Sequence, residues 1–211
     1  MYIPKHYLES DKEEIINFIK TYSFATIITV EDNFQTATHL PFVVTQTENE
    51  IILTAHFAKA NSQWTEILNN KVLVIFSEPH AYISPKYYNS KMNVPTWNYV
   101  SVHLYGTGKI ITEQEQSLDL MEKMIVNFEE DYKTQWDSLP IEYKTRMLKG
   151  VVVFQITVTD IQAKKKLSQN KEKSERQRII SVFEKSNDNN EKSIAELIKK
   201  NEGKNQLYNK E

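Results

Sequence analysis

The stretch VPTWNYVSVHLYGTGKI, residues 94–110, carries the pattern from which the fold class follows. Val100, Val102 and Leu104 are apolar and alternate with polar residues. A period of two is typical of a strand that buries one of its faces. The pattern predicts a long strand over residues 98–111, so a sheet is the first element to place.

Five more segments have the composition of strands, and several stretches between them have the apolar spacing of helices. Six mostly antiparallel strands with short helices between them favour a small barrel, mainly β with flanking helices, of the α+β class. We expect a first domain over residues 1–170 and a C-terminal helical extension with a frayed tail over 171–211. The strand segments are 24–30, 35–44, 50–57, 71–77 and 150–161. The helical segments are 11–20 (capped by Ser10 and Glu13), 58–68, a stretch from Thr112 to Phe128, 140–148 and 172–199, which a polar loop interrupts.

The composition excludes several classes of protein. The 211 residues include no cysteine, so there is neither a disulfide framework nor a cysteine-based metal site. Only four glycines are present, and neither GxGxxG nor GxxxxGK[ST] occurs, which excludes the usual glycine-rich phosphate loops. No apolar run approaches 18 residues and the N-terminus turns polar at once. We therefore expect a cytoplasmic protein without a membrane span.

The charge distribution bears on nucleic-acid binding. The formal net charge is −2 and the isoelectric point is about 6.2, whereas DNA-binding domains are usually basic because they neutralise phosphates. Residues 164–178 are an exception, with seven Lys or Arg against two Glu. This segment keeps direct DNA binding open as an alternative, although no helix-turn-helix is recognisable.

The first candidate site is TAHFAKANSQW, residues 54–64. His56 ends a predicted strand, Lys59 lies just beyond it and Asn61 opens a predicted helix. A helix N-terminus presents free N–H groups and a nearby ammonium adds a full charge, so this arrangement suits a phosphate or carboxylate. The alternative is that Asn61 only caps the helix and Lys59 is solvated.

The second candidate is KKKLSQNK, residues 164–171. Lys166, Ser168 and Gln169 place a cation, a hydroxyl and an amide close together after a strand, and all three can donate to an anionic ligand. The alternative is a basic loop that is simply solvated.

The third candidate is the aromatic cluster at the mouth of the long strand. Trp97 and Tyr99 point to one side of an extended chain and Asn98 to the other. Aromatic rings in this position can stack on a planar ring while the amide reads its polar edge. Core packing with hydrogen-bonded tips is the alternative.

The histidines do not indicate a structural metal site, because neither an HxxxH nor an HxH pair occurs. A single histidine suffices as a haem ligand, so His39, His56 and His103 remain candidates for that role. No GxSxG motif and no paired carboxylates are visible, and the catalytic residues, if any, stay unknown.

Several motifs together resemble one known family, the PaiB-like FMN-binding proteins, which are often described as negative transcriptional regulators. The resemblance covers roughly residues 1–180, and PTWNY and KLSQN are its most specific parts. The motifs are HLPF (39–42), HFAKANSQW (56–64), VIFSEPHAYISPKYY (74–88), VPTWNYVSVHLYG (94–106) and KGVVVFQI with KKKLSQNK (149–171).

The resemblance implies a split β-barrel of the flavin-reductase and pyridoxamine-phosphate-oxidase type. It also implies a homodimer that holds FMN at the subunit interface, a regulatory role and, with the flavin, a possible oxidoreductase activity. By the same resemblance, Trp97, Asn98 and Tyr99 wall the isoalloxazine ring, and Lys59 with Asn61 holds the phosphate. Lys166, Ser168 and Gln169 close the site, and His103 or Lys166 lies near the pyrimidine edge of the flavin.

One position departs from the family pattern. Ser77-Glu78-Pro79 stands where the family usually has a glycine before the proline. A glutamate near the phosphate would repel it, so Glu78 either faces away or weakens FMN binding. Two alternatives to the flavin reading are kept, namely haem or another tetrapyrrole on the same barrel, and direct DNA binding without a cofactor.

Overall fold

A computed structural model describes residues 1–68 and 70–208 and divides the chain into two compact units. Unit 1 consists of Met1–Ile15, Ser77–Val102 and Gln162–Glu211, and unit 2 of Ile16–Phe76 and His103–Ile161. Two long strands, β8 (Thr96–Ile110) and β9 (Val151–Lys166), contribute residues to both units. The predicted boundary at residue 170 stays a prediction, because this division does not test independent folding.

Unit 2 contains most of the sheet, in the order β3-β2-β6-β8-β9-β5-β4. The pairings β2–β3, β2–β6, β4–β5 and β5–β9 are antiparallel, as the strand pattern predicts. The β2–β3 turn at Asp32 and Asn33 has positive φ values of 49° and 63°, which suits a tight hairpin. The strands here are β2 (Phe24–Glu31), β3 (Phe34–Pro41), β4 (Val43–Gln46), β5 (Ile51–Ala58) and β6 (Lys71–Phe76).

Aromatic side chains from separate strands fill the core of unit 2. The Phe57 and Phe154 rings stack with centroids 4.7 Å apart, and Phe42 meets Phe154 and Phe76 edge-on at 6.2 and 5.9 Å. All four are at most 1% exposed. Such offset and edge-to-face pairs add to the free energy gained from burial, so this cluster fixes the strand ends around it.

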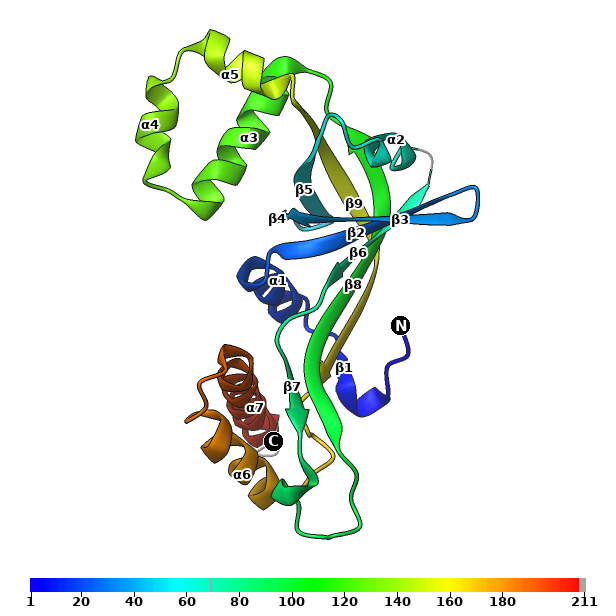
Figure 1. The fold of residues 1–211 in the computed structure, drawn as a ribbon, viewed down its shortest axis with the longest axis vertical. Helices are drawn as coiled ribbons and strands as arrows, with labels where there is room; N and C mark the ends of the chain where they lie inside the picture. The colour runs from blue at the N-terminus through cyan, green and yellow to red at the C-terminus, as the bar shows by residue number, and fades with distance from the viewer. Residues whose placement is uncertain (69, 209–211) are drawn as a thin grey trace. The chain divides into compact units, whose positions relative to one another are not determined.

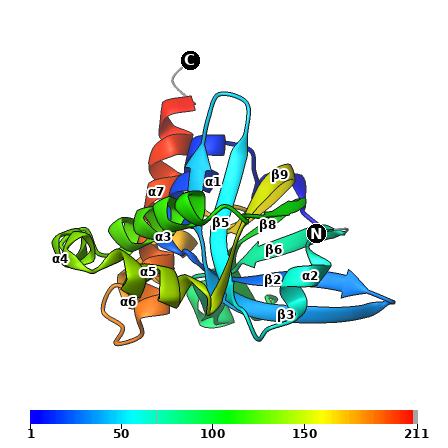
Figure 2. The same cartoon turned by 90° about the horizontal axis from the view of Figure 1, so that it is seen from above.

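The helix predicted over residues 58–68 is wrong in length, since α2 is only Gln63–Glu66 and lies beside the β2–β3 hairpin (Figure 2). Ala58 still pairs with Val151 in the sheet and the Lys59 N–H donates to the Gly150 carbonyl, so the chain leaves the strand too late for a longer helix. The sequence also predicts an apolar face of Ala60, Trp64, Ile67 and Leu68. Ile67 is buried as expected, but Leu68 is exposed and the polar Gln63 is buried instead.

Three helices follow β8 in unit 2 and are drawn in green to yellow-green in Figure 1. The buried residues of α3 are Ser117, Leu120 and Met124. The apolar spacing predicts a different stripe, and its members are only partly buried or, for Phe128, 50% exposed. That stripe is Leu118, Met121, Ile125 and Phe128. Glu113, not Thr112, is the N-cap of α3, and its side chain makes no cap hydrogen bond. These helices are α3 (Gln114–Phe128), α4 (Tyr132–Ser138) and α5 (Ile141–Leu148); only α4 was not predicted.

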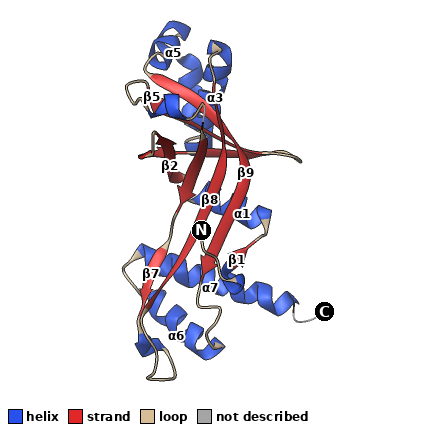
Figure 3. Cartoon of the chain, turned by 90° about the vertical axis from the view of Figure 1, so that its right-hand side faces the viewer, coloured by secondary structure: helices blue, strands red, loops and turns tan. Residues whose placement is uncertain are grey.

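Unit 1 combines the N-terminal segment with the start of β8, the end of β9 and two C-terminal helices. The helices α6 and α7 lie beside β7 and the short helix η2 (Figure 3), and the Phe183 ring meets Tyr87 edge-on at 6.1 Å. The elements are η1 (Lys5–Tyr7), β1 (Leu8–Glu9), the start of α1 (Lys12–Thr21), β7 (His80–Ile83), η2 (Pro85–Tyr87), α6 (Lys173–Phe183) and α7 (Asn189–Tyr208).

Two predictions at the chain ends need correction. The α1 helix is capped by Asp11, whose carboxylate accepts from the Glu13 and Glu14 N–H groups, and not by Ser10. The tail expected to fray after residue 199 is helical to Tyr208, and residues 209–211 lie outside the described part of the chain. Over the described residues, no helix combines the length and apolar character needed to span a bilayer.

Candidate functional site

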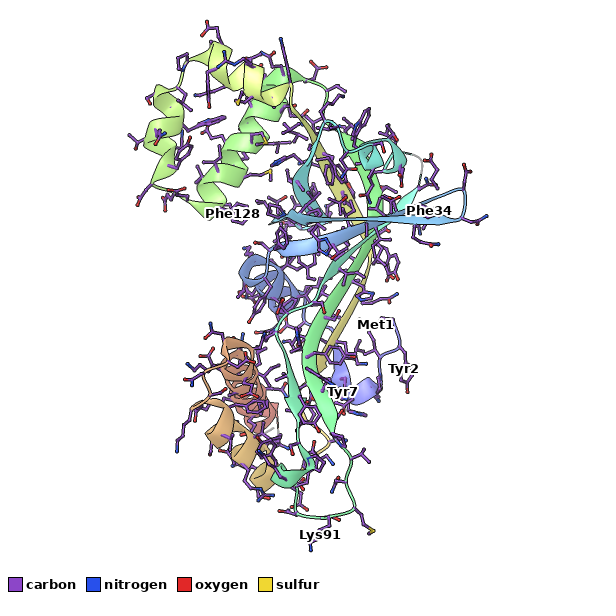
Figure 4. All side chains as sticks on the ribbon, in the orientation of Figure 1. Met1, Tyr2, Tyr7, Phe34, Lys91 and Phe128 are labelled. Atoms are coloured by element: carbon purple, nitrogen blue, oxygen red, sulfur yellow. The ribbon has the colours of Figure 1, made fainter. Side chains whose placement is uncertain are left out.

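Unit 1 contains a cavity of about 220 Å³ that is lined by hydroxyl, amide and ammonium groups. Its walls come from η1, from the segment around the start of β8 and from the turn that follows β9. Figure 4 labels Tyr7 on η1 and also Lys91, which belongs to the loop before β8. The lining residues are Tyr7, Tyr88, Asn93, Val94, Thr96, Asn98, Lys166, Ser168, Asn170 and Lys171.

A pair of buried side chains joins β8 to the turn after β9. The Asn98 amide donates to the Ser168 hydroxyl at 2.9 Å, and that hydroxyl lies 3.2 Å from the Asn98 carbonyl oxygen. Asn98 is fully buried and Ser168 is 3% exposed. Ser168 has a φ of 59°, a left-handed conformation that a non-glycine residue adopts only when its surroundings hold it there.

Gln169 holds the same turn through its own side chain. Its carbonyl oxygen accepts from the Leu167 N–H at 2.7 Å and its amide donates to the Lys165 carbonyl at 2.6 Å. The Lys171 N–H closes the turn on the Ser168 carbonyl at 3.0 Å. Gln169 therefore shapes the cavity from outside, while Asn98, Lys166 and Ser168 line it.

Two ammonium groups face the cavity. Lys166 donates to the Thr96 hydroxyl, and Lys171 donates to the Asn93 carbonyl oxygen at 2.8 Å while lying 4.0 Å from the centre of the Tyr88 ring. Within the described residues, neither ammonium forms a salt bridge with a carboxylate. Burial lowers the pKa of Lys166 because it removes water from the charged form, and the nearby Lys164 charge lowers it further.

Two tyrosine hydroxyls complete the donor set. Tyr88 is 8% exposed and its hydroxyl is buried without a hydrogen-bond partner in the described structure. Burial raises its pKa, and the nearby Glu175 charge raises it further. The Tyr7 hydroxyl donates to the Asn170 side chain at 3.2 Å, and burial likewise raises its pKa. Both phenols stay protonated near neutral pH and can donate.

Unit 2 contains a second cavity, of about 300 Å³, that includes the predicted anchor Lys59. The Lys59 ammonium lies 4.3 Å from the centre of the Trp64 ring, and Lys149 lines the same cavity. Neither lysine forms a salt bridge within the described residues. The other lining residues are Ile110, Ile111, Thr112, Gln114, Ser117, Thr145, Leu148, Val151, Val152 and Val153.

Asn61 does not line this cavity, because its side chain is used within unit 2. Its amide donates to the Thr38 hydroxyl at 2.9 Å, and its carbonyl oxygen accepts from the Gln63 N–H at 3.0 Å. The second bond matches the capping alternative that the sequence left open. With α2 only four residues long, the expected phosphate cradle at a helix N-terminus is not formed.

The three candidate histidines lie on three different strands. His39 on β3 is exposed and stacks on Phe24 at 6.3 Å, whereas His56 on β5 has a buried Nδ1 without a hydrogen-bond partner. Burial lowers the pKa of His56 and of the half-buried His103 on β8. No cluster of three or more His, Cys, Asp or Glu suited to a metal occurs among the described residues.

The aromatic cluster of β8 is divided between surface and interior. Trp97 is 52% exposed and meets Tyr82 edge-on at 5.9 Å, with His80 at 6.0 Å. Tyr99 is half-buried, with the Lys164 ammonium 5.3 Å from its ring centre. The unusual Glu78 is exposed, and its carboxylate lies 4.0 Å from His80 Nδ1. Trp97 thus offers an open ring face, as stacking requires.

Sequence reasoning missed six of the residues that line the unit 1 cavity. Five of them stand inside or beside the quoted motifs, but a motif does not tell which of its side chains face inward. Tyr7 lies far from those motifs in the sequence and reaches the cavity only because β1 pairs with β9 at Leu8 and Lys164. The missed polar residues are Tyr7, Tyr88, Asn93, Thr96, Asn170 and Lys171.

Comparisons with known proteins agree with this picture. A family model described as "Putative FMN-binding domain" matches residues 1–160. The "Protease synthase and sporulation protein PAI 2" of Bacillus subtilis strain 168 is 40% identical over 201 residues, which cover 94% of this chain and 96% of that protein. An uncharacterized protein of Emericella nidulans is 27% identical over 202 residues, covering 77% and 80%.

Solved structures support the fold. The FAD and heme binding protein from Mycobacterium smegmatis aligns with a TM-score of 0.60 at 13% identity, over 76% of this chain and 73% of that one. The flavocytochrome Anf3 from Azotobacter vinelandii aligns with a TM-score of 0.61 at 14% identity, over 78% and 72%. The fold is a split β-barrel with an antiparallel sheet and flanking helices, as the motif resemblance implied.

Proposed function

The chain belongs to the family described as "Putative FMN-binding domain", and from this premise we propose that it is an FMN-binding protein with a negative regulatory role. The regulatory part rests on the 40% identity to the Bacillus subtilis protein, whose name refers to protease synthesis and sporulation. The identity extends over nearly the full length of both chains, so it includes more than the flavin-binding region alone.

The observation that carries the proposal is the fit of the unit 2 cavity to a phosphate-tailed ligand. Lys59 and Lys149 bring two positive charges to its rim, with Thr112, Gln114 and Thr145 as polar neighbours and apolar residues as walls. Ligand cavities typically measure about 300–1,000 Å³ and combine apolar walls with a few polar groups, and this one has about 300 Å³. The donors fit FMN at its phosphate end.

The roles of the residues follow from their chemistry. Lys59 and Lys149 hold the phosphate by charge-assisted hydrogen bonds, which are stronger than neutral ones. In unit 1, the ring of Trp97 is half exposed, and Asn98, Ser168 and Gln169 fix the shape of the neighbouring turn. A bound flavin would supply reversible electron transfer, while the protein supplies position and electrostatics.

An FMN titration tests the proposal. Purified protein should quench FMN fluorescence or carry a flavin absorbance band, and the Lys59→Ala variant should bind FMN more weakly by about 1–3 kcal/mol. The matched control is Lys71→Ala, which removes an exposed lysine on β6 and should bind FMN as tightly as the wild type does. If wild-type protein does not bind FMN even when FMN is in excess, flavin binding is refuted. If the Lys59→Ala and Lys71→Ala variants bind FMN with equal affinity, the role of Lys59 is refuted.

A further inference from the structure

We propose that the unit 1 cavity binds the phosphate group of a small phosphorylated molecule, at a site separate from the flavin site proposed above. The cavity is built almost entirely from side chains that can donate hydrogen bonds, and Val94 is its only apolar lining residue among those described. Residues near 7, 88–98 and 166–171 meet there although they are far apart in sequence. The proposal rests on three features of this cavity: an unused donor, an excess of positive charge and a preformed wall.

The unused donor is the Tyr88 hydroxyl. It is buried, it lines the cavity, and no described group accepts a hydrogen bond from it. Buried polar groups in folded proteins are nearly always hydrogen-bonded, so an orphan that borders a cavity points to a bound water or a ligand oxygen. Tyr7, near the N-terminus, also lines this cavity, and its hydroxyl donates to the Asn170 side chain.

The positive charge of the cavity comes from Lys166 and Lys171, and the Lys171 charge also acts on the Glu175 carboxylate. Each donates to a neutral oxygen, Thr96 Oγ1 and Asn93 Oδ1 respectively, and each keeps further N–H groups for a ligand. Glu175, the carboxylate that acts on Tyr88, is already bound by the backbone N–H groups of Asn89 at 2.7 Å and Glu172 at 3.1 Å. The cavity therefore favours an anion.

The preformed wall is the turn after β9. Ser168 is held at a φ of 59° by its bonds to Asn98, and Gln169 locks the backbone on both sides. A strained, well-braced residue beside a cavity is a common feature of binding sites, because the cost of ordering is met before the ligand arrives. The donors are thus fixed in place for an anion of defined shape.

Phosphate fits this donor set better than carboxylate does. No arginine lines the cavity, so the forked pairing that suits a planar carboxylate is absent from the described lining, whereas lysine binds phosphate as a point charge. The terminal oxygens of a phosphate accept from several directions, as the Tyr88 phenol and the two ammonium groups require. A volume of about 220 Å³ is small for a whole flavin, so a compact ligand is expected.

Calorimetric titration with inorganic phosphate and with glycerol phosphate, at constant ionic strength, tests the proposal. Both should bind wild-type protein, and glycerol phosphate more tightly if the cavity holds the attached organic group. Tyr88→Phe removes only the hydroxyl and should weaken binding about fivefold, and Lys166→Met about tenfold or more. Lys91→Met, in the exposed loop next to the cavity, is the matched control and should leave binding unchanged.

The same variants separate this site from the flavin site. Tyr88→Phe should take up FMN as the wild type does, while Lys59→Ala should keep its affinity for phosphate. If wild-type protein binds phosphate but does not bind FMN, the phosphate site is supported and the proposed flavin function is refuted. The site is refuted by absence of phosphate binding, by tighter binding of malonate than of phosphate, or by a loss of FMN affinity in Tyr88→Phe.

Discussion

Gln63 is a polar side chain with no exposed surface, and its hydrogen bonds hold the start of α2 against the β2–β3 hairpin. Its amide donates to Thr29 Oγ1 at 2.9 Å and to the Thr36 carbonyl at 3.0 Å, and its carbonyl oxygen accepts from Thr38. A network in which every group is paired is stable, but removing one member leaves several buried groups unsatisfied.

Replacing Gln63 by leucine should therefore destabilise the protein by about 2–4 kcal/mol, because the fully buried Thr29 hydroxyl and the partly buried Thr38 hydroxyl and Thr36 carbonyl lose a hydrogen-bond partner. Urea unfolding followed by circular dichroism measures the change. Gln46→Leu, on the exposed face of β4, is the control and should shift the free energy of unfolding by about 0.5 kcal/mol at most. Similar values for the two variants would contradict the role given to the network.

His56 should make stability depend on pH. Burial lowers its pKa in the folded protein, so the unfolded chain binds the proton more readily, and stability is lost as the pH falls below about 6.5. Thermal unfolding between pH 8 and pH 5 should show a smaller loss for His56→Phe than for the wild type. His39→Phe, an exposed histidine whose removal should leave the slope unchanged, is the control. An unchanged slope in His56→Phe would contradict this prediction.

The site residues could be predicted only in part from sequence. Lys59, Lys166 and Ser168 were found because they stand in motifs, and each lines a cavity. Tyr88 and Gln63 were not, because their importance depends on which segments fold against them. An orphan hydroxyl or a buried amide becomes visible only when its surroundings are known.

At the level of the elements, β8 and β9 pack closely at Gly106. A Cβ built on Gly106 would lie 2.4 Å from the Thr157 carbonyl oxygen and 2.6 Å from Ile156 Cγ2. The clash is with backbone, which cannot rotate away, so Gly106→Ala should destabilise the protein by about 3 kcal/mol. Differential scanning calorimetry measures the shift.

Gly203 in α7 is the control for this change. A Cβ there meets nothing within 4 Å, so Gly203→Ala should stabilise the helix by up to about 1 kcal/mol. A stable Gly106→Ala protein would show that the two strands can move apart.

The strands were predictable because an alternating pattern depends on local sequence, and five of the six predicted strands are present as single strands. The strand predicted over residues 35–44 is wrong, because the chain breaks at Phe42 into β3 and β4, which stand at opposite ends of the strand order. The length of α2 was not, because the Lys59 N–H bonds to Gly150, ninety residues away, and no local pattern contains that bond. The buried stripe of α3 was misplaced for a similar reason. Apolar residues outnumber the places in the core, and tertiary packing selects among them.

At the scale of the whole molecule, we propose a homodimer, which the family motifs of the sequence imply. Trp97 and Tyr82 are about half exposed on neighbouring strands of unit 1, and aromatic residues are enriched at protein interfaces. Light scattering coupled to gel filtration should give twice the 24.8 kDa of one chain.

Trp97→Glu should shift the protein from dimer toward monomer. The control is Val94→Glu, which changes an exposed apolar residue in the loop before β8 and should leave the dimer intact. A monomeric wild type would refute the dimer.

The three-part construction of unit 1 has a consequence for how the protein is made. Tyr7 leaves the ribosome early, Tyr88 midway and Lys171 much later, and the cavity needs all three. At ordinary rates of translation the first waits roughly ten to thirty seconds for the last. During that time the nascent N-terminal segment lacks its pairing with β9 and is open to chaperones.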